Sequence, residues 1–272
     1  MDERSIGVFD SGVGGLTAVK RLRQLLPREN IVYLGDTGRV PYGSRSRETI
    51  IKYAREDAGF LLSRGVKAIM SACNTVSSAA IEAVRETAGA VPVFDVVDAP
   101  SREASAVTKN RRVGVLGTAA TVRSGAYIRA LSGFGADIEV LQTACPLFVP
   151  LAENGRTAPD DEAALIIARG YLADMLRFGA DTVILGCTHY PLLRGVIAKT
   201  LGGAVALIDS GAAAAEATAA RLAGLGLLSS RSEPGTAEYF VTDSPDGFAE
   251  PASRFLGTDI AGNITQVSLS EN

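Results

Sequence analysis

Two stretches of this chain, residues 61–73 and 175–187, repeat one pattern at a constant offset of 114 residues. Each predicts the end of a helix, a glycine that caps it, an apolar strand, and then a cysteine followed by a polar pair. A second echo joins Ile6–Ser11 to Val113–Thr118 at an offset of 107 residues. The repetition predicts two similar α/β halves, each of which presents one thiol.

Predicted strands and helices alternate along the whole chain, which is typical of parallel sheets covered by helices. We therefore expect an α/β fold with two similar parallel-sheet domains, related by pseudo-two-fold symmetry, and an active site in the cleft between them. The first domain is expected to comprise residues 1–97 plus 209–272, because the C-terminal segment returns to complete it. The second comprises residues 98–208, with the chain crossing between the halves near Asp98–Pro100.

Composition excludes several classes of protein. The chain has 272 residues, 47% of them hydrophobic, and a formal net charge of −3. This charge provides no basic field, so nucleic acid is not an expected partner. The apolar runs fall far short of the roughly 20 residues that a membrane helix needs, and no membrane association is expected. Met1–Ser5 has no signal-peptide pattern, and three cysteines without scaffold spacing fit reduced thiols in a cytoplasmic protein.

The stretch Val183–Pro191 contains the closest grouping of side chains that could take part in catalysis. An apolar segment leads through a glycine into Cys187, Thr188 and His189, and this histidine is the only one in the chain. In open α/β sheets, ligands bind at the carboxyl ends of strands, where these side chains are expected. The alternative is a small buried thiol beside a capping threonine, since free cysteine is often a core residue.

Three other segments carry polar side chains. The turn Asp10–Gly15 resembles a phosphate loop only weakly, because it lacks the lysine of a P-loop and the spacing of a dinucleotide fingerprint. A helix is expected over Thr118–Leu131, where a row of hydroxyls either faces solvent or begins with a ligand-facing Thr118. The two prolines of Ala144–Asn154 argue against a regular helix there, and Cys145 in this loop is expected to be structural.

Two matched thiols admit several interpretations. A Cys73–Cys187 disulfide would need an oxidising compartment, and zinc would need ligands that the sequence does not supply, since it contains no C-x₂-C pair. No metal and no cofactor are therefore expected. A Cys-His hydrolase, with His189 as the base and Asp10 orienting it, would leave the second cysteine without a task.

Proton transfer at a stereocentre accounts for both thiols. Inversion needs one group on each face of a planar carbanion, so that one removes a proton and the other returns one. A thiol, with an ordinary pKa of about 8.5, can serve as either base or acid when neighbours tune it. Asp10 and His189, one from each half, are the candidate residues for adjusting the pKa values of the thiols.

Several separated motifs occur in the order found in glutamate racemases, and together they resemble that family over essentially the whole chain. These motifs are Phe9–Thr17, Tyr33–Thr37, Val40–Gly43, Ala72–Thr75 and Leu185–Pro191. The resemblance implies a cofactor-independent enzyme that makes D-glutamate for bacterial peptidoglycan, and it suggests a homodimer. Gly38 and Val76 stand where alanine is usual in the family, and neither carries a chemical group of the site.

By this resemblance, Cys73 and Cys187 are the two catalytic acid/bases, with Cys187 on the L-face and Cys73 on the D-face. The resemblance also implies a set of residues that line the substrate site: Asp10, Ser11, Pro41, Tyr42, Gly43, Asn74, Thr75, Thr118, Glu153, Thr188 and His189. No basic residue is obvious near Pro41–Gly43, so backbone N–H groups are expected to hold the side-chain carboxylate there.

Two rival functions remain open. A racemase of another acidic amino acid, such as aspartate, would use the same scaffold, although relatives of that kind tend to carry glutamate where His189 stands. A non-catalytic binder of amino acids would use the same cleft, but it has no need of two matched thiols.

Overall fold

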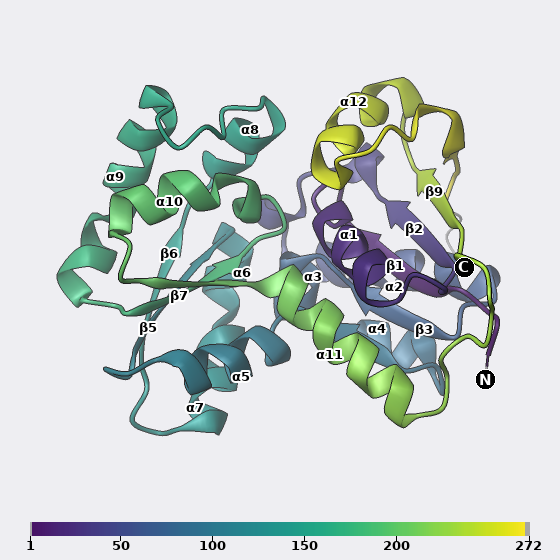
Figure 1. Ribbon diagram of the computed structural model, residues 1–272, viewed down its shortest axis with the longest axis horizontal. Coiled ribbons are helices and arrows are strands. Elements are labelled where there is room, and N and C mark those ends of the chain that lie inside the picture. The colour runs from purple at the N-terminus through teal and green to yellow at the C-terminus, as the bar shows by residue number, and fades with distance from the viewer. Residues whose placement is uncertain (1, 270–272) are drawn as a thin grey trace.

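Two parallel sheets form the framework of the protein, whose computed structural model describes residues 2–269. One sheet has six strands in the order β10-β9-β2-β1-β3-β4, and the other has four in the order β6-β5-β7-β8. All their pairings are parallel. We call the parts built on them the six-stranded unit and the four-stranded unit; they lie side by side in Figure 1. The predicted fold class is therefore confirmed.

The six-stranded unit combines the beginning and the end of the chain. Its strands are β1 (Ile6–Asp10), β2 (Ile31–Gly35), β3 (Ala68–Ser71), β4 (Val93–Asp95), β9 (Ala237–Val241) and β10 (Ile264–Gln266). Its helices are α1 (Leu16–Leu25), η1 (Thr37–Arg39), η2 (Tyr42–Ser44), α2 (Arg47–Ser63), α3 (Asn74–Ala79), α4 (Ile81–Ala88), α11 (Ser210–Gly224), α12 (Pro245–Leu256) and η4 (Ala261–Asn263).

The four-stranded unit is built from the middle of the chain. Its strands are β5 (Arg112–Gly117), β6 (Glu139–Ala144), β7 (Thr182–Gly186) and β8 (Ala206–Asp209). Its helices are α5 (Asp98–Val107), α6 (Ala119–Ser124), α7 (Ala126–Phe134), α8 (Phe148–Glu153), α9 (Glu162–Phe178), η3 (Tyr190–Leu193) and α10 (Arg194–Leu201).

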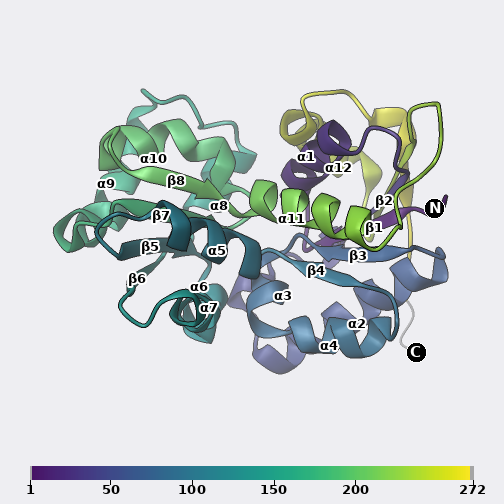
Figure 2. The same cartoon turned by 60° about the horizontal axis from the view of Figure 1, so that its bottom comes forward.

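The repeat seen in the sequence is also a repeat of topology. Strands β2-β1-β3-β4 and β6-β5-β7-β8 have the same order, so the central strands β1 and β3 correspond to β5 and β7. These central strands are short apolar runs buried on both faces, as parallel strands usually are. Helices cover both faces of each sheet in Figures 1 and 2, and each face has its own apolar core. The two cysteine-bearing strands therefore occupy equivalent places.

Three local expectations need correction. The expected helix over 118–131 is two helices, because Gly125 adopts a left-handed conformation between α6 and α7. The loop 144–154 contains the short helix α8. Pro150 is tolerated there because it falls in the first turn, where the backbone N–H groups have no partner within the helix and proline therefore loses no hydrogen bond. Residues 98–100 begin α5 rather than form a bare crossing. Within residues 2–269, no helix is both long and apolar enough to cross a membrane.

Candidate active site

A pocket of about 260 Å³ lies between the two units, and Cys73 and Cys187 both line it. Every residue that the sequence analysis assigned to the site lines this pocket except Glu153, which reaches it through His189. Its full wall consists of Asp10, Ser11, Val40, Pro41, Tyr42, Gly43, Ser44, Cys73, Asn74, Thr75, Thr118, Ala119, Pro146, Val149, Pro150, Cys187, Thr188 and His189.

The chemistry-bearing side chains are presented at the carboxyl ends of the central strands. Asp10 is the last residue of β1, and Cys73 follows β3 and precedes α3. In the other unit, Thr118 follows β5 and caps α6, where its hydroxyl accepts a hydrogen bond from the N–H of Thr121 at 3.2 Å. Cys187 directly follows β7. Parallel strands bring these ends to one edge of each sheet, and the two edges face the same pocket.

Cys73 is a buried free thiol beside a buried carboxylate. Burial is the largest cause of its raised pKa, about 12, and the charge of Asp10 adds to it. The Oδ2 atom of Asp10 accepts hydrogen bonds from the N–H groups of Gly12, at 3.2 Å, and Gly15, at 3.0 Å. Its Oδ1 atom is buried and has no hydrogen-bond partner within residues 2–269. The pocket wall thus contains one carboxylate oxygen able to accept a hydrogen bond from a ligand.

Cys187 has a cationic neighbour instead. Its Sγ lies 4.0 Å from Nδ1 of His189, and Nε2 of the same ring lies 2.8 Å from Oε1 of Glu153. Burial disfavours the imidazolium, but the Cys187 sulfur and the Glu153 carboxylate outweigh it and raise the pKa of His189 to about 10. His189 is therefore protonated at neutral pH, and Cys187 has a cation beside it.

Small residues let the two units meet at the pocket. A Cβ atom at Gly14 would lie 2.1 Å from Oγ1 of Thr188, and one at Gly43 would lie 2.8 Å from Cβ of Thr118. The hydroxyls of Thr75 and Thr118 are 3.1 Å apart across the same boundary. Glycines at these two positions are therefore required for the close approach of the units.

Asn74 is held by two residues, Tyr127 and Ser210, that the sequence analysis did not connect with the site. Its Oδ1 accepts a hydrogen bond from the hydroxyl of Tyr127 at 2.6 Å, and its Nδ2 donates to Oγ of Ser210 at 3.1 Å. The hydroxyl of Ser210 in turn donates to the carbonyl oxygen of Leu185, at 2.8 Å. Sequence alone gave no signal for this network, because its members are distant along the chain.

The Tyr42 hydroxyl points away from the pocket, into a cluster of carboxylates. It contacts Asp36 and lies 3.0 Å from Oδ2 of Asp57. Arg39 bridges both carboxylates and also contacts Glu56. Burial, followed by the charge of Asp36, raises the pKa of Asp57 well above its usual range. Tyr42 can therefore meet a ligand through its backbone or its ring, while its hydroxyl anchors the loop.

The rest of the wall is apolar or neutral. It consists of Val40, Ser44, Ala119, Pro146, Val149 and Pro150, and the sequence had marked the two prolines in the segment 144–154. No lysine or arginine belongs to the wall. In the part of the chain that the structure describes, no group of three or more His, Cys, Asp or Glu side chains could hold a metal ion.

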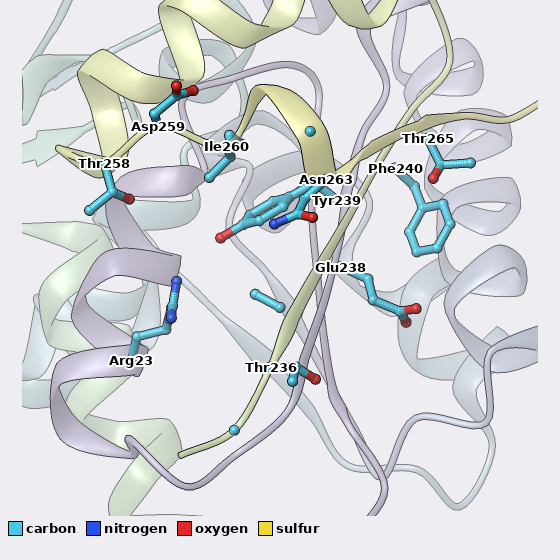
Figure 3. Close-up of a pocket in the computed structure, with 13 residues that line it drawn as sticks. Arg23, Thr236, Glu238, Tyr239, Phe240, Thr258, Asp259, Ile260, Asn263 and Thr265 are labelled. Atoms are coloured by element: carbon cyan, nitrogen blue, oxygen red, sulfur yellow. The ribbon is translucent and has the colours of Figure 1, made fainter.

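A larger hollow, of about 760 Å³, lies at the outer edge of the six-stranded sheet. Figure 3 shows Arg23, Tyr239 and Asn263 around it, between β9 and the segment that follows α12. The described residues that line this hollow include neither cysteine nor histidine. The pocket with the two thiols is therefore the candidate active site.

Comparison with known proteins agrees with this geometry. Residues 8–218 match the family model of Asp/Glu/Hydantoin racemase. A curated glutamate racemase from Geobacter metallireducens is 48% identical, over 99% of this chain and 98% of the relative. The crystal structure of glutamate racemase from Francisella tularensis in complex with D-glutamate has a TM-score of 0.92, with 40% identity and 99% of each chain covered. The glutamate racemase structure from Thermus thermophilus, in complex with beta-chloro-D-alanine, has a TM-score of 0.88, with 47% identity and the same coverage. The chain belongs to the Asp/Glu/Hydantoin racemase family.

Proposed function

We propose that this protein is a glutamate racemase, which interconverts L- and D-glutamate by proton transfer between two thiols and supplies D-glutamate for peptidoglycan. The observation that carries the proposal is the placement of two buried free cysteines, one at the carboxyl end of an equivalent strand in each sheet, in the wall of one pocket. Relatives named glutamate racemase at 48% and 47% identity over nearly the full chain support the choice of substrate.

The proposed reaction conserves all atoms and electrons. The Cys187 thiolate takes the Cα proton from the L-face, and the electron pair of the broken C–H bond passes into the α-carboxylate. The Cys73 thiol then gives its proton to the opposite face, and D-glutamate leaves. After one turnover Cys187 is protonated and Cys73 is a thiolate, so the reverse reaction uses the same groups in exchanged roles.

The pocket offers partners for each polar group of glutamate. The free Oδ1 of Asp10 is suited to accept a hydrogen bond from the substrate ammonium. Hydroxyls of Ser11, Thr75 and Thr188 and nearby backbone N–H groups are suited to the carboxylates, because the wall contains no lysine or arginine. Neutral donors in a water-poor pocket stabilise the extra negative charge that develops when the proton leaves.

The remaining expectations are part of the same proposal. The activity requires neither pyridoxal phosphate nor metal, and exhaustive chelation followed by added zinc tests this: loss of activity and its recovery with zinc would contradict it. The chain divides into domains 1–97 plus 209–272 and 98–208, and two copies form a homodimer, which sedimentation velocity measures.

Circular dichroism of purified protein with each glutamate enantiomer tests the central claim. Either enantiomer should lose its signal without added cofactor, because the equilibrium mixture is racemic. Aspartate in parallel separates the nearest rival. Exchange of the Cα proton with deuterated water separates an enzyme from a non-catalytic binder: binding without exchange would refute the proposal.

A further inference from the structure

Residues 40–44, which we call the pocket loop, all line the thiol pocket. In the part of the chain that the structure describes, the backbone of this loop makes no hydrogen bond with another segment; its carbonyl at Tyr42 accepts from the N–H of the adjacent Arg45 at 3.0 Å. The polar attachment of the loop to the six-stranded unit is the hydroxyl of Tyr42, which contacts Asp36 and Asp57. The position of this wall of the pocket therefore depends on that one hydroxyl.

The cluster beneath the pocket loop contains more acidic than basic groups. The side chains of Asp36 and Asp57 are 0% exposed, and Arg39 bridges them. A third carboxylate, that of Glu56, takes another N–H group of the same guanidinium. Ionisation of all three carboxyl groups would leave excess negative charge in a buried place, which is costly unless one of them keeps its proton.

The hydrogen bonds of Tyr42 require such a proton. Its hydroxyl has one hydrogen but lies within hydrogen-bond distance of a carboxyl oxygen of Asp36 and of Oδ2 of Asp57, the latter at 3.0 Å. It can donate to only one of them. The other contact is a hydrogen bond only if that carboxyl group is protonated and donates to the phenol oxygen; otherwise two buried acceptors would face each other.

The contacts of the two aspartates decide which one is protonated. Asp36 accepts from Nε of Arg39 at 2.6 Å and from the hydroxyl of Thr242 at 2.7 Å, so its charged form is well solvated by donors. Asp57 has only a longer contact, 3.3 Å, from Nη2 of Arg39 to its Oδ1. Its Oδ2 is therefore free to carry the proton toward Tyr42.

The electrostatics of Asp57 agree with this count. Burial, followed by the charge of Asp36 at the end of β2, raises the pKa of Asp57 well above its usual range, and Glu56 on its own helix adds to the effect. Arg39 of η1 and the hydroxyl of Tyr42 in η2 act in the opposite direction without reversing the shift.

We propose that Asp57 is a positioning residue: as a neutral carboxylic acid it donates its proton to the hydroxyl of Tyr42, which donates in turn to Asp36, and this chain fixes the pocket loop where it contacts the substrate. The substrate contact rests on the proposed function; the proton on Asp57 does not. A neutral Asp57 also leaves one negative charge fewer near a pocket that is to accept the two carboxylates of glutamate and has no lysine or arginine in its wall.

Infrared difference spectroscopy of wild type against Asp57→Asn, in water and in heavy water at neutral pH, tests the protonation without substrate. We expect the carbonyl band of a protonated carboxylic acid in wild type, shifted by heavy water and absent from the variant. Its absence from wild type would overturn the proposal.

The pH dependence of stability gives a second test. Unfolded Asp57 loses its proton near the ordinary pKa of 3.8, whereas the folded protein retains it, so unfolding becomes easier as pH rises. Asp57→Asn lacks this proton. The unfolding equilibrium constant of wild type relative to Asp57→Asn, measured in urea, should therefore rise about tenfold per pH unit between about pH 5 and 7. A constant or falling ratio would contradict the proposal.

A matched control removes an exposed carboxylate instead. Asp174→Asn on α9 changes a side chain that is 69% exposed and therefore solvated both before and after folding. Its ratio should stay within about twofold over the same pH range. An equal rise in both variants would assign the pH dependence to overall charge and overturn the role of Asp57.

Racemisation kinetics test the positioning. Asp57→Leu removes the donor and should raise KM for glutamate about fivefold to tenfold with kcat within about twofold, as expected when a binding wall is loosened. Asp57→Asn should restore both parameters to within about twofold of wild type, because its amide N–H can still donate to Tyr42. A KM in Asp57→Asn as high as in Asp57→Leu would refute the neutral donor.

The variant Tyr42→Phe shows whether Asp57 acts through the hydroxyl, since it removes that group and keeps the ring and backbone at the pocket. It should raise KM as Asp57→Leu does, and the double variant should be no worse than either single one. Additive effects would overturn the chain. If wild type racemises no glutamate, the proposed function fails, while the infrared and unfolding results still decide the proton on Asp57.

Discussion

Cys73 and Cys187 occupy equivalent positions in the two units but have neighbours of opposite charge. Each follows a central strand of a parallel sheet. Cys73 lies with the buried carboxylate of Asp10, and burial together with that charge raises the pKa of Cys73 to about 12. Cys187 lies with His189, whose pKa is raised to about 10 despite its burial. One thiol thus has a raised pKa beside a carboxylate, and the other lies beside a cation.

This contrast shows how a repeated scaffold can supply two different functions from one residue type. The backbone of each unit places a sulfur at the pocket, and side chains of opposite charge then lie beside the two sulfurs. The proposed conversion of L- to D-glutamate uses Cys73 as the acid and Cys187 as the base.

Removal of either thiol should abolish racemisation and leave proton exchange on one face. Loss of a general acid or base typically lowers the rate by roughly 10²–10⁴-fold. Cys73→Ala should still exchange the Cα proton of L-glutamate with deuterated water, and Cys187→Ala that of D-glutamate, as measured by proton NMR. Interconversion by either variant at near-wild-type rate would refute the two-thiol mechanism, and swapped preferences would refute only the assignment of faces.

The variant His189→Asn should remove the cation beside Cys187, so that the two thiols no longer have neighbours of opposite charge. Loss of a charged partner should lower kcat/KM by roughly 10- to 100-fold. Both directions should fall equally, because enantiomers have equal free energies and the equilibrium constant stays at one. In wild-type protein kcat/KM should decline above about pH 10, where His189 loses its proton. If this decline persists unchanged in His189→Asn, the imidazolium is not its cause.

The free energy of unfolding should also depend on the protonation of His189. The pKa of His189 rises from 6.5 to about 10 on folding, so its stabilising contribution is complete below pH 6.5 and is lost as pH rises toward 10. Urea unfolding should show a fall of about 1–3 kcal/mol between pH 6.5 and pH 9. A matched series with His189→Asn should be flatter over this range, and an equal slope would assign the change to other groups.

The third cysteine should be dispensable for activity. Cys145 is buried, and burial, followed by the charge of Cys187, raises its pKa to about 12, but it does not line the pocket. Cys145→Ala should keep turnover within about twofold and cost about 1 kcal/mol of stability, because only a small side chain is removed from the core. Thermal unfolding and the racemisation assay measure the two effects. A loss as large as that of Cys73→Ala would mean that the wrong thiols were chosen.

The sequence predicted the parts of the site that depend on local pattern. Apolar strands followed by Cys73 and Cys187 were visible because both the strand and the turn after it are short-range features. The bounds of helices were predicted less completely where they depend on a single glycine or proline. Gly125 divides the expected helix in two, and Pro150 is accommodated in the first turn of α8. These outcomes depend on backbone geometry that the pattern of apolar residues does not specify.

Longer-range partners required the tertiary structure. The recurrence of strand, glycine and cysteine at a fixed spacing was enough to predict two α/β halves with one thiol each. Only the folded chain decided that Tyr42 turns its hydroxyl toward Asp57. It also decided how deeply Asp10 and His189 are buried. The physical reason is that the energy of a charge depends on burial and distance, and both are set by residues far away in the chain.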